Sequence, residues 1–316
     1  MASAFSLLVV AYGWHKLTGS FHPSLIEVGD FSFSKTREIA MAPEDIVETR
    51  VALAQPYRYL GKGAHLFAFV SRDGRYVIKF VKRKEPWIRM FCRLLRDAVR
   101  FRGIYVDRTV LPRSVEGLSA SAAFAYERLK PFTETLFLHF NPTEDLKVVL
   151  SVRSGIGRLF RLDLDRLQFI VQRRAVPVAD YLLTLRKANC LSEAERAVSD
   201  LLALTERRAR LGYRDKDPRL LRNFGFVDGR AVQWDIGGFG PDTPTNMDRY
   251  YYAEESRVME ETLRKWLIGH YPELLPFVKE AFCRLRKNQV FDGKGFTDTC
   301  SCDSIRTISL SPTSTK

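Results

Sequence analysis

The segment that most restricts the fold of this chain runs from residue 213 to residue 240. Asp217, Asn223 and Asp235 stand there as polar residues among apolar neighbours, and Asp228-Gly229, a pair typical of a tight hairpin turn, lies between the last two. The short apolar runs that flank this turn, and that we expect as its two strands, are residues 224–227 and 231–234. Such a hairpin brings an amide and a carboxylate together at its open end, next to the loop that carries Asp217.

Two interpretations of this segment are open. Carboxylate and amide oxygens suit phosphoryl transfer, which needs hard oxygen ligands for Mg²⁺ and a carboxylate to orient or deprotonate the acceptor. The alternative is an ordinary surface hairpin in which Asp217 only caps a turn. A second segment, far upstream, favours the first interpretation.

That upstream segment combines a glycine-containing turn with a lysine. Gly61 and Gly63 lie between two predicted strands, and a further hairpin turn leads to Lys79, which apolar residues flank on both sides. Glycines let backbone amides approach a phosphate closely, and an ammonium group in the next strand can reach the same phosphate. A plain hairpin with a surface lysine would not explain the apolar neighbours of Lys79.

The charge of the chain indicates an anionic partner. The 316 residues carry a net charge of +13 at pH 7, which suits nucleotide phosphates, an acidic membrane surface or nucleic acid. Basic residues gather in 82–113 with apolar residues at near-helical spacing. This segment either packs on its own domain as a solvated helix, which we favour, or lies on an acidic membrane. Nucleic acid ranks low because the segment lacks interleaved aromatic platforms and a reader motif.

The cysteines and the two ends of the chain bear on compartment and domain limits. The five cysteines are odd in number and show no metal-ligand spacing, which favours free thiols in a reducing compartment such as the cytoplasm. The apolar run 4–14 is shorter than the ~20 residues of a membrane span. We expect a buried strand or helix there, with a weak membrane anchor or export as the alternatives. Residues 291–316 are polar and are expected to form a disordered tail.

Periodicity and turn signals predict a mixture of strands and helices. The further strands expected are 57–60, 75–80, 135–140 and a hairpin of 159–164 with 167–172. The helices expected are 115–129, ended by Pro131, and then 177–189, 192–210, 246–268 and 272–288. A capping box of Ser192 with Glu195 is expected to start helix 192–210. Residues 20–45 show no clear period and are expected to form a connecting arm.

The order of these parts resembles that of the protein-kinase superfamily, and more narrowly that of a group of small bacterial kinase-like proteins. The resemblance covers about residues 55–285. The similar segments are 60–70 for the Gly-rich loop, 77–79 for the strand with the nucleotide lysine, 169–173 for the hinge, 214–223 for the catalytic loop and 235–237 for the metal-binding Asp-Phe-Gly, here Asp-Ile-Gly.

The resemblance implies a fold class, namely an α+β, two-lobed protein-kinase-like fold. A small antiparallel β-sheet N-lobe would occupy about 51–172 and a mostly helical C-lobe about 173–290, within a kinase-like domain at 51–290. An N-terminal arm at 1–50 would precede the domain.

The resemblance also implies roles for individual residues in an ATP- and Mg²⁺-dependent phosphotransferase. Asp217 would orient the acceptor hydroxyl, while Asn223 and Asp235 would hold Mg²⁺. Lys79 would bind ATP and would pair with a helix glutamate, for which Glu127 is our choice. The rivals of Glu127 are Asp97 and Glu116, and the remaining nucleotide contacts are Gly61 and Gly63 in the turn and Gln172 and Arg173 in the hinge, whose backbone would hold adenine.

The sequence departs from the family pattern at several points. Leu66 replaces the third loop glycine, Asp217 and Asn223 stand one residue further apart than usual, and Asp215 is a competing carboxylate. No segment after Asp235 resembles the usual activation segment, which leaves room for a small-molecule acceptor of unassigned identity. A catalytically weak pseudokinase that serves as a nucleotide-binding scaffold or regulator is therefore the alternative function.

Overall fold

The computed structural model describes residues 21–26, 33–82, 115–211, 213–215, 217–241 and 248–290. The apolar run 4–14, the tail 291–316 and all of 82–113 except Lys82 lie outside the described residues, so the expectations for them stand as predictions. Within the described part of the chain, no helix is long and apolar enough to cross a membrane.

The described residues form a mixed α+β fold. The strands are β1 (Tyr57–Lys62), β2 (Leu66–Ser71), β3 (Tyr76–Val81), β4 (Thr135–His139), β5 (Val149–Arg153), β6 (Leu159–Asp163), β7 (Phe169–Arg173), β8 (Val176–Pro177), β9 (Tyr213–Asp215), β10 (Phe224–Val227), β11 (Arg230–Gln233) and β12 (Phe239–Pro241). The α-helices are α2 (Pro43–Leu53), α4 (Val115–Thr133), α5 (Val178–Lys187), α6 (Leu191–Arg210), α7 (Leu220–Asn223), α8 (Asp248–His270) and α9 (Leu275–Val290). Short 3-10 helices are η1 (Pro23–Leu25), η2 (Lys35–Arg37), η4 (Leu164–Arg166) and η5 (Pro272–Leu274).

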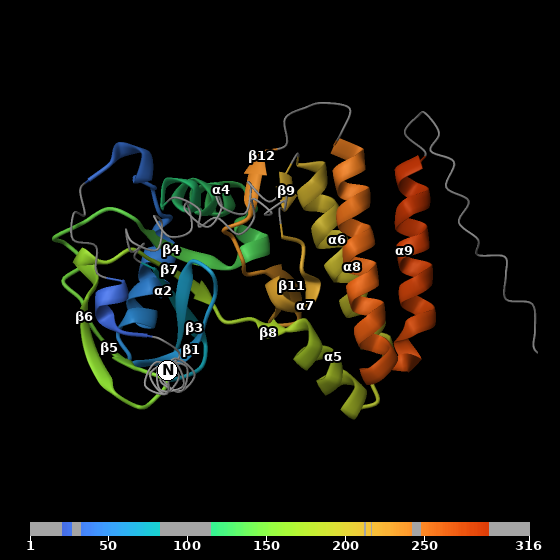
Figure 1. Ribbon diagram of the computed structural model, residues 1–316, viewed down its shortest axis with the longest axis horizontal. Helices are drawn as coiled ribbons and strands as arrows, with labels where there is room; N and C mark the ends of the chain where they lie inside the picture. The colour runs from blue at the N-terminus through green and yellow to red at the C-terminus, as the bar shows by residue number, and fades with distance from the viewer. Residues whose placement is uncertain are drawn as a thin grey trace, which may run out of the picture.

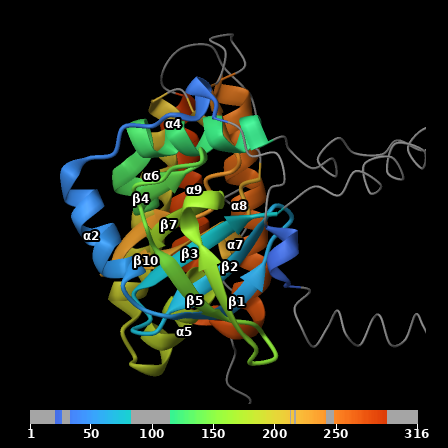
Figure 2. The same cartoon turned by 90° about the vertical axis from the view of Figure 1, so that its left-hand side faces the viewer.

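Strands β1 to β7 gather at one end of the molecule, α5, α6, α8 and α9 lie at the other, and β8, β9, β11 and β12 lie between them (Figure 1). The strand-rich end is built on a seven-stranded sheet in the order β4-β7-β3-β2-β1-β5-β6, which curls as Figure 2 shows. Its neighbours are antiparallel except β1 and β5, which are parallel. The sheet is therefore larger than the small antiparallel sheet that we expected, and it is mixed.

The expected hairpin of 159–164 with 167–172 is wrong in its pairing, although both strands exist. β6 pairs with β5, a strand that the sequence analysis did not predict, whereas β7 pairs with β3 and β4. η4 lies between the two strands in the chain, and in the sheet β6 is at one edge while β7 is next to the opposite edge.

The two faces of the sheet pack in separate cores because side chains alternate along each strand. Ile78 and Phe80 of β3 belong to a cluster with α2 and with residues of β1, β2, β5, β6 and β7. Val81 of β3 and Ile170 of β7 pack with α4 on the other side. Lys79 alternates with Ile78 and Phe80, so it lies on the sheet face that α4 covers.

Helix α4 lies between the strand-rich and helical ends, close to β12 (Figure 1). We predicted from the sequence that this helix ends before Pro131, but it continues to Thr133. A proline near the end of a helix removes one hydrogen bond, here to the carbonyl of Glu127. Glu127 is exposed, so water can take the place of that bond.

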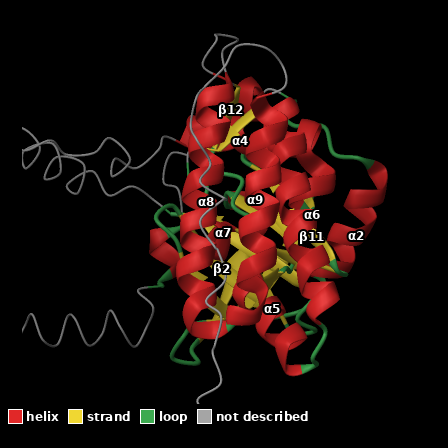
Figure 3. Cartoon of the chain, turned by 90° about the vertical axis from the view of Figure 1, so that its right-hand side faces the viewer, coloured by secondary structure: helices red, strands yellow, loops and turns green. Residues whose placement is uncertain are grey.

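Helices α5, α6, α8 and α9 share one core, and Figure 3 shows α8 and α9 on the outer face of this end. The buried face of α6 is the predicted one and includes Ala194, Val198 and Leu201. The expected capping box is wrong: the N-cap is Cys190, and Ser192 donates its hydroxyl to Glu193. Ser192 already lies inside the first turn, so its position does not suit a cap.

The predicted hairpin at 224–234 is confirmed. β10 pairs with β11, which begins and ends one residue earlier than the expected 231–234, and the turn residues Asp228 and Gly229 have φ of 49° and 78°. Positive φ at both central positions is what a tight two-residue hairpin turn requires. β8 pairs with β10, and β9 pairs with β12 in a separate two-stranded sheet.

Gly225 in β10 has no room for a side chain. A Cβ atom there would lie 2.2 Å from the carbonyl oxygen of Val176 and 2.5 Å from the Trp234 ring. Because the first contact is with the backbone of β8, Gly225→Ala is expected to lower the free energy of unfolding by about 3 kcal/mol. The matched control is Gly269→Ala in α8, where nothing lies within 4 Å of the Cβ position. Urea denaturation measures both, and equal stabilities would contradict the close approach of β8 and β10.

Candidate functional site

Lys79 connects the seven-stranded sheet to the β10–β11 hairpin. Its ammonium donates a hydrogen bond of 2.7 Å to the main-chain carbonyl oxygen of Trp234, the residue that follows β11. The side chain is only partly exposed. Burial lowers the pKa of Lys79 to about 8, and the negative charge of Asp235 opposes this shift. Lys79 is thus a desolvated cation whose neighbouring charge is a carboxylate.

Asp235 begins the turn between β11 and β12. Its Oδ1 accepts a hydrogen bond of 3.1 Å from the amide of Gly237, which ties the carboxylate to its own turn. Its charge favours the ammonium of Lys79 and contributes to the raised pKa of Asp215. Lys79 and Asp235, which the sequence analysis assigned to one nucleotide, are therefore close neighbours.

Asn223 joins the preceding loop to the same place. It is buried at the end of α7, and its Nδ2 donates to the carbonyl oxygen of Asp217 over 2.7 Å. The main-chain carbonyl oxygen of Asn223 accepts a hydrogen bond of 2.9 Å from the amide of Trp234. The amide of Trp234 thus bonds Asn223, and the carbonyl oxygen of Trp234 bonds Lys79. Both bonds lie directly before Asp235 in the chain. Since the Asn223 side chain donates through nitrogen, its amide oxygen is the atom available for a ligand.

The two rival carboxylates of the loop have different environments. Asp217 is partly exposed, and its Oδ1 lies 2.7 Å from Nε of Arg219. Asp215 is buried, and its oxygens accept from the amide of Asp217 at 2.9 Å and from the side chain of Gln233 at 2.5 Å. Burial raises the pKa of Asp215 despite the opposing charge of Arg208. Asp217 can therefore meet a substrate, whereas Asp215 supports the loop from inside.

Gly61 and Gly63 flank the end of β1 at the turn to β2. The amide of Gly63 donates to the carbonyl of Leu66 at 2.9 Å, and its carbonyl accepts from the ammonium of Lys82. Neither glycine has a positive φ, and nothing lies within 4 Å of either Cβ position. The backbone thus does not require glycine here, and the space beside it is open.

Gln172 and Arg173 have structural partners at the end of β7. Nε2 of Gln172 donates to Thr133 and Thr135 at 3.1 Å each. Arg173 forms ion pairs with Glu48 at 2.6 Å and with Glu134 at 3.2 Å, and its amide donates to the carbonyl of Glu134. The Arg173 side chain and Nε2 of Gln172 are thus engaged within the protein, whereas Oε1 of Gln172 is buried without a hydrogen-bond partner among the described residues. The amide of Arg173, one of the backbone groups expected to hold adenine, is engaged as well.

Glu127 does not pair with Lys79 among the described residues. It is exposed on α4, and the carboxylate whose charge acts on Lys79 is Asp235. Asp97 and the side chain of Glu116, the two rivals, lie outside the described residues. α4 contacts the site through Ser121, whose hydroxyl donates to the carbonyl oxygen of Ile236 at 2.6 Å. A serine in an alanine-rich helix carries no signal by which sequence analysis could have found this contact.

The described residues contain no group of three or more His, Cys, Asp and Glu side chains that could hold a metal ion. Asn223 and Asp235 offer an amide oxygen and a carboxylate, which are oxygen ligands of the kind Mg²⁺ takes. Mg²⁺ in phosphoryl-transfer sites is usually bound by one or two carboxylates together with substrate phosphates. The donor set therefore fits a cation that arrives with a nucleotide.

Compared with models of known protein families and with curated proteins, the sequence has no match. The function is therefore inferred from the geometry around Lys79 and Asp235.

Proposed function

We propose that this chain is an ATP- and Mg²⁺-dependent phosphotransferase with a two-lobed protein-kinase-like fold. The observation that carries the proposal is the hydrogen bond from Lys79 to the Trp234 carbonyl, directly before Asp235. It brings a desolvated cation and an acidic group to one place from segments far apart in the sequence. A nucleoside triphosphate needs both: a cation for its phosphate oxygens, and oxygen ligands for its Mg²⁺.

The distribution of the parts over the molecule supports the fold assignment. The glycine-containing turn and Lys79 lie in the strand-rich end, which would be the N-lobe. Asp217 and Asn223 precede the hairpin that packs with the helices, which would form the C-lobe. The β5–β6 hairpin and α2 would be additions to the N-lobe that the resemblance does not imply.

In this proposal Lys79 and the turn at Gly61 and Gly63 receive the phosphates. Lys79 would exchange its hydrogen bond to the Trp234 carbonyl for one to a phosphate oxygen. The open space beside the two glycines supports their role, because the fold itself would tolerate larger residues there. Glycine is favourable where a ligand must approach the backbone closely.

Asp217 would orient the acceptor hydroxyl and accept its proton. It is the exposed carboxylate of the loop, and Asn223 and Asp215 hold its main chain on both sides. Asn223 and Asp235 would hold Mg²⁺, which when bound would neutralise charge on the transferred phosphate. Adenine would be held by groups other than the amide of Arg173, since this donor is already bonded to Glu134.

The alternative function is a pseudokinase that binds nucleotide without turnover. The ion pair of Asp217 with Arg219 favours it, because the arginine occupies a carboxylate oxygen that would otherwise meet the acceptor hydroxyl. An anionic acceptor could instead displace the pair. We further propose a cytoplasmic or other reducing location, and a contact of 82–113 with an acidic membrane as the alternative to packing on its own domain.

Transfer of the γ-phosphate distinguishes the two functions. The purified chain should release ADP slowly from Mg²⁺-ATP, and Asp217→Asn should lower this rate about 100-fold or more, the size of a general-base contribution. Asp228→Asn, in the turn of the β10–β11 hairpin, is the matched control and should leave the rate unchanged. ATP binding with equal, background turnover in all three proteins would establish the pseudokinase instead.

A further inference from the structure

Helix α4 holds the turn that carries Asp235. The buried hydroxyl of Ser121 donates to the carbonyl oxygen of Ile236 at 2.6 Å. Ile236 itself is buried in a cluster with Leu118, Ala122 and Ala125 of α4. One hydrogen bond and one apolar contact thus fix the residue next to Asp235 to a single helix, so a movement of α4 would move the Asp235 turn.

Residues 34–53, which we call the strap, run along α4 and end in α2. Part of this segment was expected to be a connecting arm, but it packs closely on the fold. The main chain of Ser34 forms two hydrogen bonds of 3.0 Å with the side chain of Asn141. Ile39 and Met41 pack on the cluster that contains α4 and Ile236. The strap therefore shares one core with the Asp235 turn.

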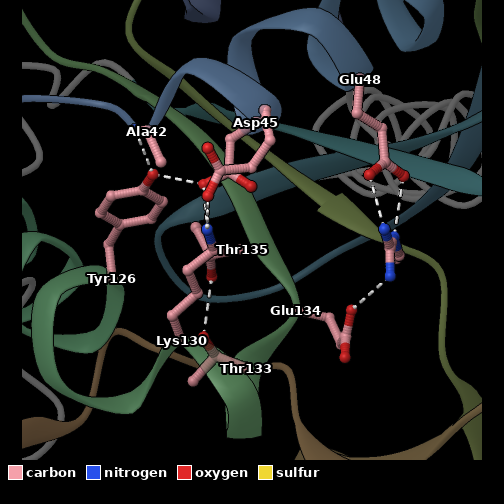
Figure 4. Close-up of polar contacts among 10 residues, drawn as sticks. Ala42, Asp45, Glu48, Tyr126, Lys130, Thr133, Glu134 and Thr135 are labelled. Carbon is pink, nitrogen blue, oxygen red and sulfur yellow. Dashed lines mark hydrogen bonds and ion pairs between the residues drawn. The ribbon is translucent and has the colours of Figure 1, made fainter.

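Asp45 of α2 is the polar centre of the contact between the strap and α4. It is 4% exposed, and Lys130 of α4 lies 2.5 Å from its Oδ2. The hydroxyl of Tyr126 donates to the same carboxylate and accepts a hydrogen bond of 2.8 Å from the amide of Ala42 (Figure 4). Removing this buried carboxylate would leave a cation and a hydroxyl without their partner, which is costly. Asp45 therefore strongly stabilises the contact between the strap and α4.

Helix α2 also contacts the end of β7. Glu48, one turn after Asp45, accepts two hydrogen bonds from Arg173, of 2.8 and 2.6 Å. Arg173 also pairs with Glu134, which has a φ of 50° and a second partner in Arg230 of the β10–β11 hairpin, at 2.9 Å. Figure 4 shows Asp45 and Glu48 extending from α2 toward these separate groups. The strap is thus bonded directly to α4, and Arg173 and Glu134 link it to the hairpin that precedes Asp235.

We propose that the strap is a built-in regulator of the Asp235 turn, with Asp45 as a positioning residue that fixes α4 and Ser121 as the residue that passes this position to Ile236. Displacement of the strap would release α4 and loosen Asp235. The coupling itself is a property of the protein without ligand; only its effect on turnover rests on the proposed function.

Hydrogen exchange of the protein without nucleotide tests the coupling. Asp45→Asn should speed exchange in both 115–133 and 234–239, and Ser121→Ala should speed it in 234–239, each by about tenfold, as the loss of one buried hydrogen bond does. Ser256→Ala is the matched control, since Ser256 is a buried serine whose hydroxyl bonds a carbonyl of its own helix at 2.8 Å. It should speed exchange in neither segment. If Asp45→Asn unfolds, Tyr126→Phe, which removes only a hydroxyl, replaces it.

Faster exchange confined to α2 and α4, with 234–239 unchanged in both Asp45→Asn and Ser121→Ala, would overturn the proposal. A second readout uses turnover. Ser121→Ala should raise the Mg²⁺ concentration for half-maximal rate about tenfold, while Ser121→Thr, which keeps the hydroxyl, should restore it. A wild-type chain without turnover but with the expected exchange pattern would refute the phosphotransferase and leave the coupling in place.

Discussion

Asp235→Asn is expected to lower kcat for phosphoryl transfer about 1,000-fold, the effect of removing one group that stabilises charge in a transition state. The substitution keeps the size of the side chain and its Oδ1, so the hydrogen bond from Gly237 can persist. It removes the negative charge that acts on Lys79 and would hold Mg²⁺. The protein should therefore remain folded while activity is lost.

The control for this variant is Asp228→Asn, the same change in the turn of the β10–β11 hairpin. Asp228 is exposed with a φ of 49°, a conformation that asparagine adopts readily. Its kcat and its melting temperature should match those of the wild type. An Asp235→Asn variant that retains more than about a tenth of the wild-type kcat would show that this carboxylate has no part in charge stabilisation.

Lys79 is expected to make stability and nucleotide affinity change in opposite directions as pH rises above 8. The pKa of Lys79 is about 8 in the folded protein and 10.5 in the unfolded chain. Between these values the unfolded chain binds more protons, so the contribution of Lys79 to stability rises with pH, by about 3 kcal/mol in total. A bound phosphate would favour the ammonium, so nucleotide affinity should fall up to about tenfold per pH unit above pH 8.

The measurement compares the wild type with Lys79→Met, because other groups also titrate in this range. Lys82 has a pKa of about 8 as well, and its contribution cancels in the difference between the two proteins. Urea denaturation gives the stability difference, and calorimetry in buffers of different ionisation enthalpy gives the protons taken up on binding. The wild type should take up a proton with the nucleotide near pH 8 to 9, and Lys79→Met should bind weakly at every pH. Uptake that is equal in both proteins would assign the proton to another group.

The parts of the fold that sequence analysis predicted are those that local chemistry determines. Asp228-Gly229 required positive φ at two residues in succession, and this specified the hairpin and its register. The apolar neighbours of Lys79 indicated a lysine in a buried strand, and the structure places it there. Lys79 and the main chain of Asn223 both bond the main chain of Trp234, next to Asp235, while the roles of these residues at a nucleotide stay predictions.

The parts that were missed depend on contacts between distant segments. Residues 34–53 have no strong amphipathic period, because Asp45 and Glu48 are satisfied by partners on α4 and β7. The parallel pairing of β1 with β5 joins strands far apart in sequence, and no turn between them records it. Glu127 lies on the exposed face of α4, and helix periodicity alone does not say which face of α4 meets the sheet.

The most direct test of the account is whether Lys79 and Asp235 act on one nucleotide. The melting temperature is measured with ATP, with and without Mg²⁺, for the wild type, Lys79→Met and Asp235→Asn. ATP should raise the melting temperature of the wild type, and Mg²⁺ should increase the rise. Lys79→Met should lose the rise under both conditions, and Asp235→Asn should lose only the part that Mg²⁺ adds. Equal rises in all three proteins would contradict a nucleotide site between these two residues.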